Sequence, residues 1–245
     1  NYNAHRYMAT YGIKEIVYPK LQKQIGKVYM QYKRKEDNAI FPYLQKKLKP
    51  QKMIIDIGAR KGNWYKNIAK FFPDSEAHLF EPTPKIVSII KPKFKKATQH
   101  VHQVALSDEI GQLDFHIDLE LGGWSGLTKQ RQNGTYHTIT VEVRTLDSYN
   151  FKNVGLIKID VEGNELKTLL GCIDTITKNK PIIYFECADV HMINYNYNSG
   201  DIYDFFDKTN YKIIDLDFNT CTKEKLLNHT ASDSSFYHNF IACPK

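Results

Sequence analysis

Long hydrophobic runs and a secretion signal are both missing from this sequence of 245 residues. No apolar stretch approaches the roughly 18 to 20 residues that a membrane-crossing helix needs. Residues 1–10 also lack the apolar core of a secretory signal. We therefore expect a cytoplasmic protein without a membrane span.

Cysteine is scarce as well. The four cysteines are widely scattered, without the C-x-x-C spacing of a zinc site or a redox pair: Cys172, Cys187, Cys221 and Cys243. We expect reduced thiols that act as small buried hydrophobic side chains. This pattern argues against a disulfide-stapled scaffold.

A uniform excess of one charge is absent, although the net charge is +7. Residues 1–50 hold 11 Lys and Arg against 3 acids, which leaves 23 basic and 24 acidic residues for 51–245. The basic leading segment favours an anionic partner, unless it is only a solvated helical face. Basic clusters at 33–35 and 91–96 keep an enzyme that modifies nucleic acid, or a nucleic-acid-binding module, as the alternative function. The near-neutral body argues against that alternative.

The leading segment has the apolar spacing of helices. Ile13, Ile16, Val17 and Leu21 recur at short helical steps, with a break expected at Pro19, and a second short helix is predicted over 40–48. We divide the chain into a basic helical N-terminal extension, residues 1–50, and a catalytic domain, residues 51–245. The extension could join two copies of the chain in a homo-oligomer.

From residue 51 onward, apolar strands alternate with helices. Strands are predicted at 53–57, 77–80, 99–106, 156–161 and 181–187, helices at 64–72, 84–90, 164–171 and 203–208, and a closing antiparallel pair at 211–216 and 236–242. This alternation predicts a doubly wound α/β fold with a parallel sheet covered on both faces. Residues 113–143 depart from it and predict a β insertion over one edge of the sheet.

The first predicted strand runs into a glycine turn that contains Asp56, Gly58, Ala59 and Gly62. Ligands of open α/β sheets bind beyond the carboxyl ends of the strands. The spacing is G-x-x-x-G, whereas a dinucleotide site prefers G-x-G-x-x-G, so a nicotinamide oxidoreductase is disfavoured. An acid before the turn repels a phosphate and suits an ammonium group. The turn therefore favours S-adenosylmethionine as cofactor, although a purely structural turn stays open.

The next two strands also end in polar residues. Glu81, followed by Pro82, lies 25 positions after Asp56, close to the spacing at which a carboxylate binds two ribose hydroxyls. Gln103, Ala105 and Ser107 at the end of the third strand are candidates for the adenine slot. A structural turn after the third strand would explain Gln103, Ala105 and Ser107 equally well.

The fourth strand ends in an acidic segment that contains Asp160 and Glu162. Two acids separated by one residue point the same way from a strand. We expect Asp160 to face the reacting end of the cofactor and predict Asp160 or His191 as the catalytic base. Glu186 lies at the tip of the next strand and would orient the acceptor, while an ordinary surface histidine stays the alternative for His191. An alternative way to activate the acceptor is a Mg²⁺ ion held by Asp160, Glu162 and Glu186, which the sequence leaves open. No metal site is assigned.

These segments in this order resemble the FkbM family of S-adenosylmethionine-dependent methyltransferases. The matching segments are 56–59 with Gly62, 80–82, 105–108 with Gly111, 143–147, and 157–163 with Glu165, within about residues 53–186. The resemblance implies a seven-stranded Rossmann-like methyltransferase sheet. It also implies cofactor contacts at Asp56, Gly58 and Glu81, with Asp160 near the methyl group.

The activity that the resemblance implies is methyl transfer to oxygen. We expect the acceptor to be a hydroxyl, or a phosphate-linked oxygen, of a sugar, glycan or related small molecule. A loop at Trp124 would lie beside a sugar ring or cover the core. The sequence leaves the acceptor itself open.

Overall fold

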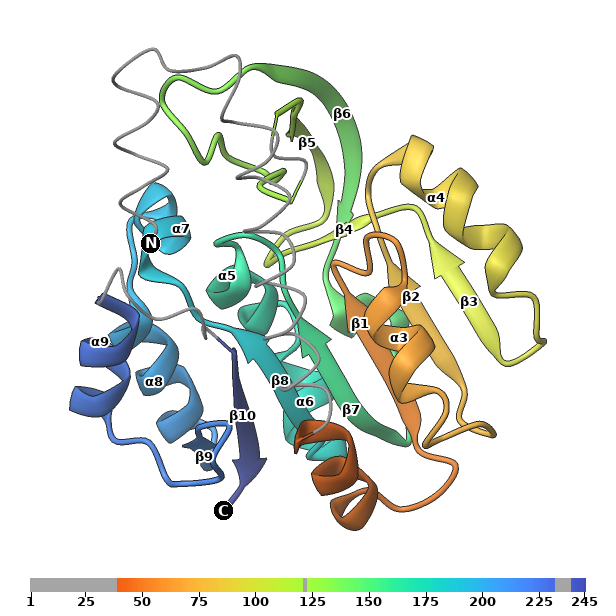
Figure 1. Cartoon of the computed structure of the whole chain (residues 1–245), viewed down its shortest axis with the longest axis vertical. Coiled ribbons are helices and arrows are strands. Elements are labelled where there is room, and N and C mark those ends of the chain that lie inside the picture. The colour runs from red at the N-terminus through yellow and green to blue at the C-terminus, as the bar shows by residue number, and fades with distance from the viewer. Residues whose placement is uncertain (1–38, 121–122, 232–238) are drawn as a thin grey trace, which may run out of the picture.

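The computed structural model describes residues 39–120, 123–231 and 239–245 (Figure 1). The predictions on residues 1–38, which include the break at Pro19 and the oligomer through the N-terminal helices, lie outside the described residues.

The described residues form a central sheet of seven strands in the order β3-β2-β1-β7-β8-β10-β9. The strands are β1 (Met53–Ile57), β2 (Ala77–Phe80), β3 (Gln99–His102), β7 (Val154–Ile159), β8 (Ile182–Glu186), β9 (Tyr211–Ile214) and β10 (Asn239–Pro244). β10 is antiparallel to both β8 and β9, while the pairs of β1 with β2 and β7 are parallel. The predicted doubly wound sheet and its closing antiparallel pair are confirmed.

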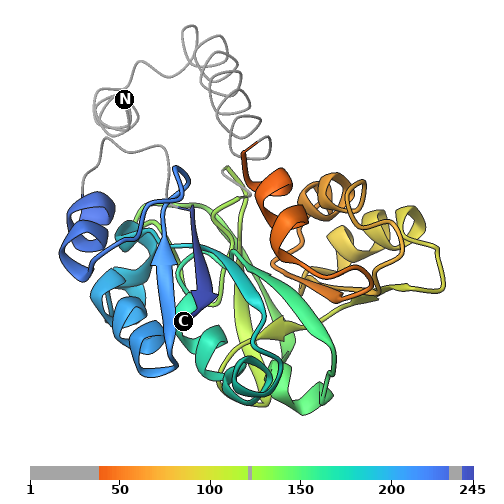
Figure 2. The same cartoon turned by 90° about the horizontal axis from the view of Figure 1, so that it is seen from below.

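Helices cover both faces of this sheet, on opposite sides in Figure 2. They are α3 (Asn63–Ile68), α4 (Pro84–Ile90), α5 (Glu165–Leu170), α6 (Ile173–Asn179), α7 (Asp189–Met192), α8 (Ser199–Lys208) and α9 (Lys223–Ala231), with 3₁₀ turns at Lys91–Lys93, Leu146–Tyr149 and Ile193–Tyr195. All five residues of β1 are buried because alternate side chains enter different cores. Ile55 and Ile57 join the core under α5, α6 and α8, whereas Ile54 joins the core under α3.

The predicted helix at 40–48 is present as a helix over residues 39–47. Ile40, Phe41 and Leu44 are buried in the same core as Trp64 of α3. This helix, drawn in red-orange in Figure 2, therefore packs on the sheet. The division of the chain at residue 50 stays a prediction.

The single strand predicted over 99–106 is wrong. β3 ends at His102, and Ala105–Leu106 forms β4 in a separate three-stranded sheet of order β4-β6-β5, with β5 at Gly111–Asp118 and β6 at Tyr136–Arg144. Asn164 and Thr168 both donate hydrogen bonds to the Leu106 carbonyl, at 3.1 and 3.0 Å. These contacts hold the chain away from β2 after His102.

The small sheet is the predicted β insertion. It lies over the end of the main sheet where the parallel strands finish, which is uppermost in Figure 1. It therefore forms a wall above the strand ends rather than a cover along one side edge.

Two further findings concern the cysteines and the length of the helices. All four cysteines are free thiols, with Cys243 partly exposed and the other three buried. Within residues 39–231 and 239–245, apart from 121–122, no helix has the length and apolar character to cross a membrane.

Candidate functional site

The turn after β1 joins three strand ends. The amides of Gly58 and Ala59 both donate to the Phe80 carbonyl at the end of β2, at 3.1 and 2.9 Å. Gly58 has a φ of +74°, and a Cβ at this position would lie 1.9 Å from the carbonyl oxygen of Asp160. Glycine is required here because the backbone turn of β1 touches the backbone that leaves β7.

Gly62, the second glycine of the turn, serves the helix that follows. Its φ is +71°, and an added Cβ would lie 2.4 Å from the ring of Phe94. Its role is therefore explained by the packing of the α3 start, and a cofactor contact at Gly62 stays a prediction.

The side chain of Lys158 lies between the carboxyl ends of β1 and β7. Its Nζ lies 3.3 Å from Asp56 Oδ1 and 3.4 Å from Asp160 Oδ2. It also donates a hydrogen bond to the Gly58 carbonyl at 2.9 Å. Burial raises the pKa of Asp56, which is completely covered, and the neighbouring ammonium group opposes this rise. One buried cation thus supports the turn and holds Asp160 at the site.

Sequence reasoning gave Lys158 no role. The available signal was a lysine in the middle of an otherwise apolar strand, where a charge needs a partner. The ion pair also places Asp56 beneath the turn. The contact of Asp56 with the cofactor stays a prediction, because the partner observed for Asp56 is Lys158.

Glu81 lies at the tip of β2, beside the turn of β1. Its two carboxylate oxygens accept hydrogen bonds from the amides of Arg60 and Thr83, at 3.0 and 2.8 Å. Burial raises the pKa of Glu81, against the effect of these amides. Each oxygen has a second lone pair, so the carboxylate can still accept two hydroxyl groups. Pro82 is buried next to it.

The three residues proposed for the adenine slot do not share one environment. Gln103 is exposed, whereas Ala105 and Ser107 are buried in and after β4. Ser107 Oγ donates to Asp108 at 3.0 Å, and its amide donates to the Arg144 carbonyl at 3.0 Å. Their role in adenine binding stays a prediction.

The turn after β7 is held from below by Glu165. Its Oε1 accepts hydrogen bonds from the amides of Val161 and Gly163, at 2.9 and 3.3 Å. Burial raises the pKa of Glu165 to about 7. The turn includes two residues with positive φ, Glu162 at 54° and Gly163 at 99°. This backbone directs the Glu162 side chain away from the strand and toward α7.

Glu162 meets His191 of α7 and Glu186 of β8. His191 Nε2 lies 3.3 Å from Glu162 Oε2, and the ligating atoms of the three residues all lie within 4.8 Å of one another. Burial and, next, the nearby Glu186 raise the pKa of Glu162 well above its usual range. The structure therefore brings together Glu186 and His191, two predicted site residues, with Glu162, which was predicted only as a ligand in the Mg²⁺ hypothesis.

This group is also where a divalent cation would fit. Two carboxylates and an imidazole are suitable ligands, and a cation would relieve the repulsion between Glu162 and Glu186. The Mg²⁺ hypothesis used Asp160 in place of His191. The structure corrects that set, because Asp160 pairs with Lys158.

The loop between β5 and β6 completes the site from above. Gln130 Nε2 donates to the Glu162 carbonyl at 2.6 Å, and its Oε1 lies 3.3 Å from His191 Nδ1. Asn194 donates to the same Oε1 at 2.9 Å. The ring of Trp124 stands edge-on to His191, with centroids 4.9 Å apart. Sequence reasoning missed Gln130, for which no local pattern gave a signal.

The carboxylates at the strand ends fit S-adenosylmethionine, the cofactor that the sequence predicts. Glu81 follows β2 and Asp160 follows β7, on either side of β1, so a pyrophosphate would meet two carboxylates. A cationic nucleoside with a free ribose suits the same groups, because carboxylates attract an ammonium group and accept hydroxyl hydrogens.

The doubly wound sheet and the acids at its strand ends define an α/β enzyme whose site lies at the carboxyl ends of the strands. The family model of the methyltransferase FkbM domain matches residues 56–213, more than half of the chain. The chain belongs to the FkbM methyltransferase family.

Two individual proteins illustrate this relationship. The 2-O-methyltransferase NoeI of Sinorhizobium fredii is 30% identical over an alignment of 159 residues, which covers 58% of this chain and 65% of the relative. The match thus spans less than two thirds of that protein. The crystal structure of methyltransferase FkbM from Methylobacillus flagellatus KT superposes with a TM-score of 0.50 at 14% identity, over 79% of this chain and 43% of the other. At that identity it supports the fold alone.

Proposed function

We propose that the protein transfers the methyl group of S-adenosylmethionine to a hydroxyl oxygen of a sugar, glycan or related small molecule. The observation that carries the proposal is the contact between His191 and Glu162 beside Asp160, at the strand ends that the cofactor would occupy. The name of the relative NoeI, a 2-O-methyltransferase, supports oxygen as the acceptor atom.

S-adenosylmethionine supplies, when bound, a methyl group that is already activated for transfer. The residues of the protein at the strand ends would bind and orient the cofactor. Glu81 would accept the ribose hydroxyls, and Asp160 would attract the ammonium group. Gly58 lets the turn after β1 pack directly against the Asp160 backbone, which keeps these strand ends together.

His191 is the better of the two predicted bases. The Gln130 carbonyl oxygen can only accept a hydrogen bond, so His191 Nδ1 carries the hydrogen and Nε2 keeps its lone pair. A proton that arrives at Nε2 would be hydrogen-bonded to an oxygen of the Glu162 carboxyl group, 3.3 Å away. Protonating Asp160 would instead disrupt its ion pair with Lys158.

The remaining groups would position the acceptor. Glu186 lies within reach of the same Nε2 and would accept a hydrogen bond from a neighbouring hydroxyl. Orientation of reacting groups contributes up to roughly 7 to 11 kcal/mol in well-aligned systems. A base of this kind contributes about 10² to 10⁴ in rate.

The wall above the base suits a carbohydrate. Trp124 is partly exposed and offers an apolar ring, while the exposed Asn194 presents an amide group nearby. Sugars pair a hydrophobic face with a rim of hydroxyls, so a flat ring and an amide recognise both parts.

Two measurements test the proposal. Calorimetric titration with S-adenosylhomocysteine and with NAD decides the cofactor, and we expect binding of the first alone. Mass spectrometry of sugars, glycans and sugar phosphates incubated with the full chain and S-adenosylmethionine should show a product one methyl group heavier. NAD binding without S-adenosylhomocysteine binding, or methylation of nucleic acid but no carbohydrate, would overturn the proposal.

A further inference from the structure

A second group of ligating side chains lies at the opposite end of β2. Glu76 directly precedes β2, His78 is its second residue, and His100 and His102 belong to β3. His78 pairs with His100 in the register of these parallel strands. Because alternate residues of a strand share a face, the three histidines lie on one side of the sheet.

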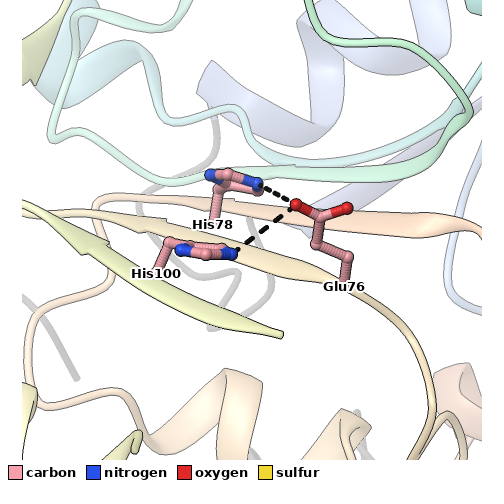
Figure 3. A group of neighbouring side chains, drawn as sticks. All are labelled: Glu76, His78 and His100. Atoms are coloured by element: carbon pink, nitrogen blue, oxygen red, sulfur yellow. Dashed lines mark hydrogen bonds and ion pairs between the residues drawn. The ribbon is translucent and has the colours of Figure 1, made fainter. Parts of the chain in front are cut away.

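The two ring nitrogens and one carboxylate oxygen converge on a point (Figure 3). Glu76 Oε1 lies 3.1 Å from His78 Nε2 and 3.6 Å from His100 Nε2, and all three ligating atoms lie within 4.8 Å of one another. Two ligand atoms bound to one zinc ion in tetrahedral geometry are about 3.3 Å apart. The observed separations from Glu76 lie on either side of that value.

His102 supports the group from behind. Its Nε2 lies 2.9 Å from His78 Nδ1, so the two rings share one hydrogen. In the absence of an ion, His78 Nε2 donates to Glu76 Oε1; with an ion bound at Nε2, His78 Nδ1 would donate the shared hydrogen to His102. A histidine that ligates a metal through one nitrogen usually donates its other N–H in this way.

Aromatic packing fixes the buried ring. His78 stacks on His100 with centroids 4.6 Å apart and contacts Phe151 at 4.2 Å. Its side chain is 8% exposed, whereas those of His100 and Glu76 are 42% and 48% exposed. One ligand is thus held rigidly, and an ion can arrive from solvent on the side of the other two.

We propose that Glu76, His78 and His100 bind one zinc-class divalent ion, with His102 as the residue that sets the tautomer of His78. Two imidazoles and one carboxylate form a ligand set that zinc accepts, while Mg²⁺ and Ca²⁺ prefer oxygen ligands. Water completes the fourth position.

The ion would be structural. Glu76 precedes β2 and Glu81 follows it, so the two sites lie at opposite ends of this strand. β3 is an edge strand that pairs with β2 in the sheet, and a metal shared by His78 and His100 would fasten it there. The proposal is therefore independent of the methyl acceptor and of the base.

Zn²⁺ titration of the EDTA-treated full chain, followed by calorimetry, tests the site, with Co²⁺ absorption as a readout of ligand geometry. The exposed ligands are changed in His100→Gln and Glu76→Gln, which should fold normally, and we expect each to weaken binding at least about tenfold. His102→Phe keeps a ring but removes the hydrogen-bond partner, and should weaken binding roughly 10- to 100-fold. His137→Gln, at an exposed histidine of β6, is the matched control and should leave binding unchanged.

The group at Glu162, Glu186 and His191 needs its own control, because it also holds ligand types. The titration is therefore repeated in His191→Gln, where the zinc site at β2 and β3 should persist. Zinc should also raise the unfolding temperature of the parent more than that of His100→Gln. Absence of zinc binding, equal binding by the parent and His100→Gln, or loss of binding only in His191→Gln would overturn the proposal.

Discussion

Lys158 of β7 lies directly opposite Asp56 of β1, with Nζ 3.3 Å from Oδ1 and both side chains almost fully buried. A buried charge is costly when its partner is removed, even where the pair itself adds little to stability. This pair lies beneath the glycine turn, so it connects the stability of the sheet to the shape of the site.

Removal of the lysine charge should therefore destabilise the fold. We expect Lys158→Met to lower the free energy of unfolding by about 3 to 5 kcal/mol, because Asp56 is left buried without its cation. Denaturant unfolding measures the change. Asp56→Asn in the Lys158→Met background should recover part of the loss, because no unpaired charge then remains on β1.

A surface lysine is the control for this variant. Lys167 is 43% exposed and lies 3.8 Å from Asp108, so Lys167→Met should change stability by less than about 1 kcal/mol. Equal effects of the two substitutions would contradict the central role of Lys158.

The glycine turn gives a second prediction. Gly58→Ala should cost at least about 2 kcal/mol of stability, because the residue has positive φ and the new Cβ would lie 1.9 Å from the Asp160 carbonyl. It should also weaken calorimetric binding of S-adenosylhomocysteine at least about tenfold. Gly111→Ala is the control, since nothing lies within 4 Å of its added Cβ. Unchanged binding in a stably folded Gly58→Ala protein would remove the turn from the cofactor site.

The strands could be predicted from sequence because the parallel ones are buried on both faces. β1 and β7 are continuous apolar runs in which Asp56 and Lys158 are the exceptions. The break between β3 and β4 could not be predicted, since it depends on hydrogen bonds that Asn164 donates from α5. Helices α6, α7 and α9 were also missed, because short amphipathic segments carry a weak periodic signal.

The site was predictable where it follows the strand order. Asp56, Glu81 and Asp160 could be predicted as site candidates because the ends of parallel strands meet at one edge. The partnership of Gln130 with His191 was not, since it depends on how the insertion and α7 fold back over that edge. The tautomer of His191 that we propose for proton transfer therefore depends on tertiary structure.

Glu165 gives a prediction on pH. Its pKa in the folded protein is raised to about 7, above the value of an unfolded glutamate. The folded state therefore holds this proton more tightly, and the resulting stability is present at pH 5 and lost as the pH rises through 7. Glu165→Gln does not titrate, so its stability relative to the parent should rise by up to about 3 kcal/mol between pH 5 and pH 8.

Paired denaturant titrations of the parent and Glu165→Gln across that range measure the difference. Comparison of the two proteins at each pH cancels the groups that they share. A constant difference from pH 5 to pH 8 would show that Glu165 does not titrate in this window.

The choice of base gives the last prediction. His191→Gln should lower kcat by about 10² to 10⁴ once the acceptor is in hand, and it should leave S-adenosylhomocysteine binding within about threefold of the parent. Asp160→Asn should mainly weaken cofactor binding, because Asp160 is paired with Lys158 rather than with His191. The two substitutions therefore separate the residue that takes the proton from the one that faces the cofactor.

Treatment with EDTA distinguishes proton transfer to His191 from activation of the acceptor by a metal ion. If His191 acts as the base alone, turnover should persist after EDTA, because no cation is needed to activate the hydroxyl. If Glu162, Glu186 and His191 instead hold a divalent ion, EDTA should abolish turnover and added metal should restore it. Near-normal turnover of His191→Gln, together with loss of turnover in Asp160→Asn at saturating cofactor, would assign the proton to Asp160.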